Sequence, residues 1–165
     1  MKYLFYLVFS LFVLQSCTSS SSPDTALSIS VLNFDELEPL LQRVNDTTYI
    51  VNFWATWCKP CVHELPDFEQ LAAEYKNEKV KFLLVSMDFP KQVQTQVMPF
   101  IEEHKIKSEV VLLFDPNANV WINKVSSEWS GSIPATLVYN KNFRIFHEGS
   151  YSYEELKSII ELNKL

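Results

Sequence analysis

The chain has 165 residues, of which 14 are Lys or Arg and 20 are Asp or Glu, so its formal net charge is −6. A length of this order predicts one domain, with a hydrophobic core large enough to fold without disulfide bridges. The basic residues are scattered and form no run, which argues against a protein that binds nucleic acid.

The first 16 residues differ in character from the rest of the chain. Lys2 precedes an apolar stretch, residues 3–14, that is interrupted only by Ser10. This stretch is too short to span a bilayer but fits the hydrophobic part of a signal peptide. The next residues, Leu-Gln-Ser-Cys at 14–17, resemble a bacterial lipobox, in which the signal is cleaved before a cysteine that becomes lipidated. A plain secretory signal that leaves Cys17 as an odd thiol is the alternative.

Cleavage before Cys17 would divide the chain into a signal peptide (1–16), a lipidated flexible tether (17–27) and a folded domain (28–165). We therefore expect a protein of the cell envelope that is lipid-anchored to a membrane and faces the periplasm. Cys58 and Cys61 would then be the only thiols of an exported domain. Because that compartment is oxidising, either a membrane electron-donor protein keeps the pair reduced or its redox potential is deliberately poised.

The domain is predicted to begin with a short strand, 28–32, and an amphipathic helix. Asn33 and Glu36 form a capping pair at the start of that helix. The apolar positions that follow are at helical spacing: Leu37, Leu40, Leu41 and Val44. Pro39 lies within this stripe, so we expect the helix to kink there or to start later. Apart from Asn52, residues 49–55 are apolar and rich in aromatic and β-branched side chains, which predicts a buried central strand.

Two cysteines stand where this strand gives way to a helix, predicted over residues 59–76. Four apolar residues of this segment are at helical spacing: Leu65, Phe68, Ala72 and Tyr75. Cys58 would therefore lie at the helix N-terminus, where free N–H groups and the helix dipole favour a thiolate of lowered pKa. Pro60 suits the first turn of the helix, whereas Pro66 lies inside it and predicts a kink.

The rest of the chain continues the alternation of strands and helices. We expect strands at 80–86 and 110–114, a helical face broken by Pro99 between them, and a helix at 117–125. Residues 136–139 and 143–147 predict a hairpin, and Ser152 with Glu155 forms a capping box that opens the last helix. This order predicts an α/β fold with a mixed sheet covered by helices on both faces. The dithiol would lie at the carboxyl edge of a central strand.

The segment Trp-Ala-Thr-Trp-Cys-Lys-Pro-Cys at 54–61 resembles the active site of the thioredoxin superfamily. Glu64 and Pro66, which follow at Cys-x-x-Glu-x-Pro spacing, resemble the TlpA/ResA branch of membrane-anchored thiol–disulfide oxidoreductases. The resemblance implies a thioredoxin-like fold, with a strand–helix insertion between positions 88 and 131 that peroxiredoxins share. It also implies that the protein reduces or exchanges disulfides of exported proteins, with apocytochrome c as one candidate substrate. No cofactor is implied other than the redox-active Cys58–Cys61 disulfide.

Within this resemblance, Cys58 attacks a partner's disulfide and Cys61 resolves the mixed disulfide. Trp57 is expected to be partly exposed and to form an apolar rim for the substrate, although core packing is its alternative role. Ile133 and Pro134 resemble the family's cis-proline loop, in which the Ile133 backbone would pair with a bound peptide. An ordinary trans proline in a turn is the alternative there.

Glu64 is the other candidate catalytic residue. Its spacing from Cys61 and Phe68 places it on the inward face of the helix, where burial makes a carboxylate costly. Thioredoxin has a buried Asp on the preceding strand at the position that Asn52 occupies here. Glu64 is therefore expected to replace that Asp as the acid–base group that serves Cys61. The alternative is a side chain that turns out to solvent.

Two other classes of function are weighed against this interpretation. A metallochaperone would hold a metal on the thiols, but that class usually has a Cys-x-x-x-Cys spacing and a distant His. A zinc site would need two further ligands, and no histidine is assigned such a role, so we predict no metal site. A peroxiredoxin-like peroxidase would carry Thr-x-x-Cys, whereas Thr56 stands only two residues before Cys58. Metal analysis of the reduced protein would separate these classes.

Overall fold

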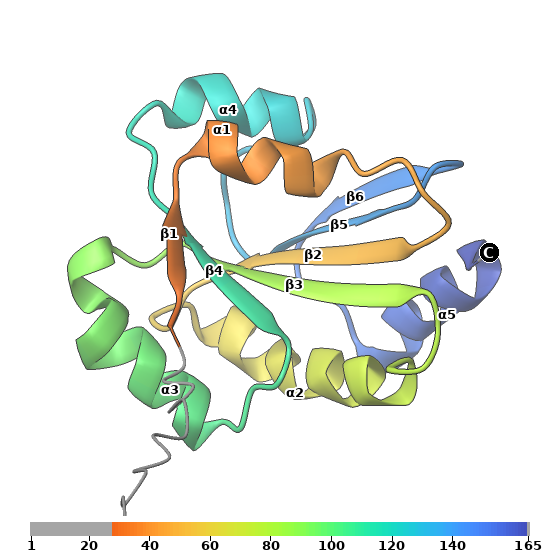
Figure 1. Ribbon diagram of the computed structural model, residues 1–165, viewed down its shortest axis with the longest axis horizontal. Coiled ribbons are helices and arrows are strands. Elements are labelled where there is room, and N and C mark those ends of the chain that lie inside the picture. Colours follow the sequence, from red (N-terminus) through yellow and green to blue (C-terminus); the bar gives the residue numbers. More distant parts are fainter. Residues whose placement is uncertain (1–27, 165) are drawn as a thin grey trace, which may run out of the picture.

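A mixed six-stranded sheet forms the centre of the domain in a computed structural model, which describes residues 28–164 (Figure 1). The strand order is β1-β4-β3-β2-β5-β6. The strands are β1 (Ser30–Leu32), β2 (Thr48–Trp54), β3 (Val80–Ser86), β4 (Glu109–Leu113), β5 (Ala135–Tyr139) and β6 (Arg144–Glu148). The expected signal peptide, the lipidated Cys17 and the tether lie outside the described residues.

The first four strands of this order run parallel, while β5 is antiparallel to β2, and β6 is antiparallel to β5. All seven residues of β2 are buried, because strands flank it on both edges and helices cover both faces. This explains why its sequence is mostly apolar on both faces and does not alternate between apolar and polar residues. The predicted mixed sheet with helices on both faces is confirmed.

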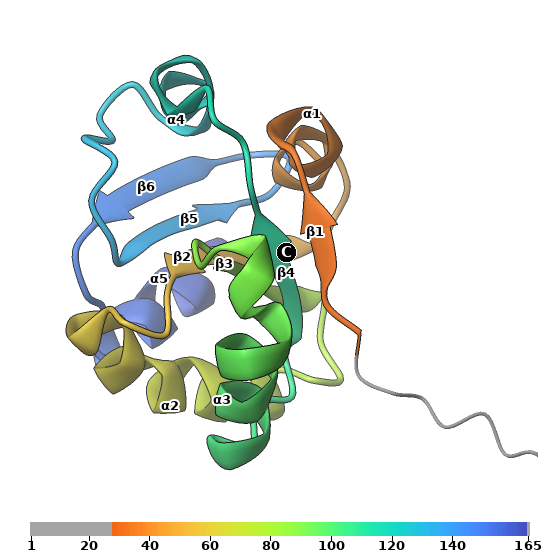
Figure 2. The same cartoon turned by 90° about the vertical axis from the view of Figure 1, so that its left-hand side faces the viewer.

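The helices divide between the two faces of the sheet (Figures 1 and 2). Two of them, α1 (Phe34–Leu37) and α4 (Ala118–Val125), lie on one face, and their Phe34, Trp121 and Val125 side chains join its hydrophobic core. The other face carries α2 (Lys59–Glu74), α3 (Met98–Glu103) and α5 (Tyr153–Asn163). Both cysteines belong to the core between α2, α3 and this second face.

Two predicted helices differ from the structure, and proline is the reason in both. The first helix ends at Leu37 and continues as a 3-10 helix over Glu38–Leu41, whose first turn holds Pro39. The predicted stripe is wrong at Val44, which lies beyond the helix and is 85 % exposed. Before α3 the chain forms a π-helix over Val93–Val97, so that Pro99 falls in the first turn of α3. A proline has no N–H to donate, and a first turn needs none there.

The active-site helix α2 accommodates its inner proline without ending at it, and Pro66 lies near its middle. The capping boxes at Asn33–Glu36 and Ser152–Glu155 both form as predicted. Among residues 28–164, no helix is both long and apolar enough to cross a membrane.

Candidate active site

Cys58 is the residue that caps the N-terminus of α2, and it forms a disulfide with Cys61. The backbone turns tightly after β2, since the Cys58 N–H donates to the Ala55 carbonyl at 3.1 Å. The Cys61 N–H in turn points at the Cys58 sulfur, at an N···Sγ distance of 3.3 Å. An N–H and a helix N-terminus placed in this way favour a negative charge on the Cys58 sulfur once the disulfide is reduced.

The two sulfurs are not equally accessible. Cys61 is fully buried, whereas Cys58 keeps a small exposed surface next to Trp57, which is 60 % exposed. The expected exposure of Trp57 is therefore confirmed, and core packing is wrong for this side chain. A partner molecule that approaches the dithiol from solvent reaches Cys58 first.

The loop before β5 lies opposite the dithiol. The Ile133–Pro134 peptide bond is cis, and the Ile133 carbonyl oxygen is 3.7 Å from the Cys58 sulfur. The pairing of Ala135 with Phe53 places this loop, because it fixes the start of β5 against the end of β2. The trans alternative is wrong, and the role of Ile133 in binding a peptide stays a prediction.

Glu64 is buried, with 2 % of its surface exposed, so the solvent-facing alternative is wrong. Its Oε1 accepts a hydrogen bond from Asn52 Nδ2 at 2.8 Å, and its Oε2 accepts one from the Tyr151 N–H at 2.9 Å. Burial raises the pKa of the Glu64 carboxyl to about 7, although both hydrogen bonds favour the ionised form. The carboxyl lies one helical turn after Cys61 on the same face of α2.

Sequence reasoning missed the residues that hold Glu64. Asn52 on β2 is fully buried and also donates from Nδ2 to Thr136 Oγ1 on β5 at 3.1 Å. The Tyr151 N–H comes from the loop between β6 and α5. The one signal available was Asn52 itself, a polar residue in the middle of a predicted buried strand.

A second buried carboxylate, Asp88, fixes the turn that leads to the dithiol. Asp88 follows β3 and accepts hydrogen bonds from the Thr56 N–H at 3.0 Å and the Thr56 hydroxyl at 2.7 Å. The Ser86 hydroxyl donates to the same carboxylate at 2.9 Å. Asp88 was not among the predicted site residues. Its position directly after a buried strand, at the edge that carries the cysteines, was the available signal.

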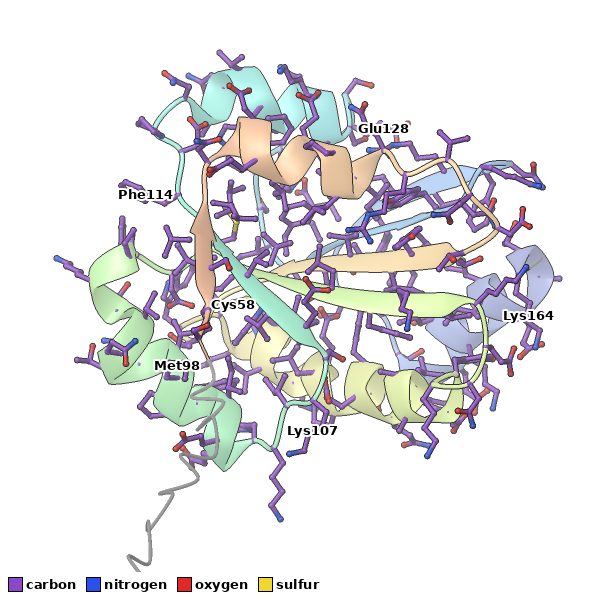
Figure 3. The ribbon with its side chains drawn as sticks, in the orientation of Figure 1. Cys58, Met98, Lys107, Phe114, Glu128 and Lys164 are labelled. Atoms are coloured by element: carbon purple, nitrogen blue, oxygen red, sulfur yellow. A yellow bond between two sulfur atoms is a disulfide. The ribbon has the colours of Figure 1, made fainter. Side chains whose placement is uncertain are left out.

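The loops after β2, β3 and β4 meet at one end of the sheet (Figure 2). Besides Trp57, two exposed aromatic residues follow these strands: Phe89 is 55 % exposed and Phe114 is 47 % exposed. Cys58 and Phe114 lie toward this end, while Lys164 lies at the opposite end (Figure 3). Within residues 28–164, no three His, Cys, Asp or Glu side chains are grouped so that they could hold a metal ion.

Comparison with known proteins gives a consistent result. The AhpC/TSA family model matches residues 23–147. The chain is 26 % identical to the thiol-disulfide oxidoreductase ResA of Halalkalibacterium halodurans over 126 residues, which cover 75 % of this chain and 66 % of that relative. It is 29 % identical to ResA of Geobacillus thermodenitrificans over 147 residues, covering 86 % and 75 % respectively. The crystal structure of StoA from Bacillus subtilis is similar, with a TM-score of 0.54 and 25 % identity over 69 % of this chain and 82 % of that one.

Proposed function

The chain belongs to the AhpC/TSA family, and we propose that it is a thiol–disulfide oxidoreductase that uses Cys58 and Cys61 to reduce or exchange disulfides of other proteins. One observation carries this proposal. Cys58 caps a helix, faces the Cys61 N–H and lies 3.7 Å from the Ile133 carbonyl of a cis-proline loop. The thiol is thus activated on one side and open to a partner on the other.

The reaction consists of two exchange steps. The Cys58 thiolate attacks one sulfur of the partner's disulfide, whose S–S bond breaks, and the other partner sulfur leaves as a thiolate and takes up a proton. Cys61 then attacks the Cys58 sulfur of the mixed disulfide and releases the second partner thiol. Two electrons pass from the Cys58–Cys61 dithiol to the partner, which leaves the enzyme with its own disulfide.

Glu64 serves the second step in this mechanism. The Cys61 thiol is enclosed by protein and must lose its proton before it attacks. A carboxyl one turn away with a pKa of about 7 can take that proton near neutral pH and return it to Cys61 when the disulfide is next reduced. Asn52 cannot fill this role because an amide does not titrate.

The surroundings of Cys58 favour a polypeptide as the partner. Trp57, Phe89 and Phe114 present exposed aromatic surface at the end of the sheet that holds the dithiol. Such surface suits the apolar side chains around a cysteine in an incompletely folded chain. The Ile133 backbone would pair with that segment in an extended conformation. Apocytochrome c is one candidate substrate of this kind.

The protein acts in the cell envelope in this proposal, held to a membrane by a lipid on Cys17 and facing the periplasm. A membrane electron-donor protein would return the Cys58–Cys61 disulfide to the dithiol. Cys17→Ala should abolish metabolic labelling with a fatty acid and disturb processing. Labelling that persists in this variant, or a mature chain that begins elsewhere, would refute the anchor.

The activity is tested by the reduction of insulin disulfides with a chemical reductant as electron source. The wild-type protein should accelerate this reaction, and Cys58→Ser should abolish the acceleration. In the reduced protein Cys58 should also alkylate faster than Cys61, with a pKa below the free value of about 8.5. If Cys58→Ser stays active, or Cys61 is the more reactive thiol, the assignment of the attacking sulfur is wrong.

A further inference from the structure

Three buried side chains from three elements form a chain of hydrogen bonds behind the dithiol. Asn52 on β2 lies in the middle and donates both N–H groups of its amide, one to Glu64 Oε1 on α2 and one to Thr136 Oγ1 on β5. All three side chains are at most 2 % exposed. Solvent therefore does not satisfy them, and each must find its partners within the protein.

The other end of the same amide has no partner. Asn52 Oδ1 is buried, and within the described part of the chain no donor reaches it. An unpaired buried carbonyl costs free energy, and a leucine of similar size would avoid that cost. If Asn52 served only as a hydrogen-bond donor, its unpaired Oδ1 would remain unexplained.

The two oxygens of Glu64 differ in what they can bind. Oε2 accepts from the Tyr151 backbone N–H, which can only donate, so this oxygen stays an acceptor in both protonation states. A carbonyl oxygen accepts from an amide N–H better than a hydroxyl oxygen does, so we place a proton arriving from Cys61 on Oε1, the oxygen that faces Asn52. A proton on Oε1 would point at the Nδ2–H group of Asn52, so two hydrogen-bond donors would face each other with no acceptor between them.

We propose that Asn52 is a positioning residue that offers Nδ2 to the Glu64 carboxylate and, after a half-turn of its amide, offers Oδ1 to the Glu64 carboxylic acid. Thr136 permits this half-turn because a hydroxyl accepts from Nδ2 in one state and donates to Oδ1 in the other. One end of the amide makes two hydrogen bonds in each state, and the opposite end makes none. The proton itself moves only between Cys61 Sγ and Glu64 Oε1.

This proposal rests on the proposed function of Glu64 and adds the device that lets a buried carboxyl alternate between two forms. The ionisable groups near Glu64 are the thiols of Cys58 and Cys61, when reduced, and Asp67 on α2. The β6–α5 side contributes Tyr151 and His147, whose rings pack at a centroid distance of 4.5 Å. The sheet contributes the neutral Asn52 and Thr136. In the oxidised protein both cysteines are held in the disulfide, so no thiol titrates together with Glu64.

The direct test is a pH titration of the oxidised protein by NMR. The side-chain carboxyl carbon of Glu64 reports its ionisation, and the two amide protons of Asn52 report their hydrogen bonds. We expect the Asn52 amide protons to move upfield as pH falls, with the same midpoint as the Glu64 carboxyl. Glu64→Gln, which places an NH2 where the acid would carry its O–H, should hold them at the low-pH position throughout.

The chain offers a matched internal control at the start of β2, where Thr48 accepts from another asparagine side chain. Asn140 Nδ2 donates to Thr48 Oγ1 at 3.1 Å and to the Asn163 carbonyl at 2.9 Å, far from any buried carboxyl of the site. Its amide protons should not follow the Glu64 titration. The proposal is overturned if the chemical shifts of the Asn52 amide protons change no more than those of Asn140 while Glu64 titrates.

Substitutions extend the test to the reaction. Asn52→Leu should raise the pKa of Glu64 by about one pH unit or more, because the carboxylate loses a donor. The pH profile of mixed-disulfide resolution should move by the same amount. Thr48→Val, which removes the matched Asn–Thr contact, should leave both unchanged. An unchanged pKa in a folded Asn52→Leu protein contradicts the proposal.

If Asn52→Leu fails to fold, variants of Thr136 test the proposal instead. Thr136→Val removes the hydroxyl and should weaken the coupled shift of the Asn52 amide protons, while Thr136→Ser should restore it. Equal behaviour of these two variants overturns the proposal. Failure of the proposed function is a different result, namely that Glu64→Gln leaves mixed-disulfide resolution unchanged even though the Asn52 amide follows the Glu64 titration.

Discussion

At the scale of single residues, Glu64 combines a buried carboxyl with two hydrogen bonds that favour its charge. Burial is the larger effect, so the pKa of Glu64 is raised to about 7 from an ordinary value of 4.5. A residue in this condition changes its charge near neutral pH. That is the property required of a group that exchanges a proton with the buried Cys61 thiol.

The raised pKa of Glu64 predicts how the stability of the protein depends on pH. Between about pH 4.5 and about pH 7 the folded protein retains a proton that the unfolded chain has released. The free energy of unfolding of the oxidised protein should therefore fall as pH rises through this window, by up to about 3 kcal/mol. Urea unfolding of the wild type and of Glu64→Gln across this range measures the effect as the difference between the two curves. Parallel curves would show that Glu64 has an ordinary pKa.

At the scale of elements, the site depends on how the loop after β2 is tied to the end of β3. Asp88 receives three hydrogen bonds there, two from Thr56 and one from Ser86, and it is 1 % exposed. Thr56 stands two residues before Cys58. The carboxylate thus fixes the turn that presents the first thiol.

Asp88→Ala should destabilise the oxidised protein by about 3 kcal/mol, because it leaves these donors unpaired in a buried place. Asp88→Asn should cost less, since its amide oxygen can still accept. Both are measured by denaturant unfolding. Asp35→Ala, at an exposed position of α1, is the control and should change stability by less than about 0.5 kcal/mol. If Asp88→Ala matches this control, Asp88 does not hold the turn.

The elements also show what the sequence could and could not predict. The β3 prediction, 80–86, coincides with the strand, and both capping boxes form, because these signals lie within a few residues of one another. The spacing of Cys61, Glu64 and Phe68 on one helical face correctly predicted a buried Glu64. The helical pattern was wrong at Val44, because the chain around Pro39 forms a 3-10 helix that ends at Leu41.

The partners within the site were beyond such reasoning. Glu64 is bonded to the Tyr151 N–H across 87 positions of the chain, and Asn52 to Thr136 across 84. Asp88 is 32 positions from Thr56. These contacts depend on strand order and on the placement of loops, which a local pattern does not encode. The sequence thus predicted the reactive groups, while their supporting hydrogen bonds required the fold.

At the scale of the whole molecule, the ends of β2, β3 and β4 bring the dithiol and exposed aromatic residues to one end of the domain. If this end binds polypeptides, Phe89→Ser should raise the KM for a protein disulfide several-fold and leave the reduction of a small aromatic disulfide unchanged. Steady-state kinetics with both substrates measures this difference. Leu162→Ser removes another apolar residue, 80 % exposed, from α5 at the far end and serves as the control.

Equal effects of Phe89→Ser and Leu162→Ser on the protein substrate would exclude Phe89 from recognition. An equal loss with both substrates in Phe89→Ser would instead indicate a disturbed dithiol. The two outcomes are separable because we expect a small disulfide to reach Cys58 without contacting Phe89.

The central claim is that Cys58 attacks a partner's disulfide and Cys61 resolves the product. Its most direct test is the intact mass of Cys61→Ser after incubation with a peptide that carries a mixed disulfide, followed by mapping of the modified residue. We expect a stable adduct on Cys58 that the wild-type protein does not accumulate. The assignment of the two cysteines is contradicted if Cys61→Ser forms no adduct, or if Cys58→Ser forms one on Cys61 at a comparable rate.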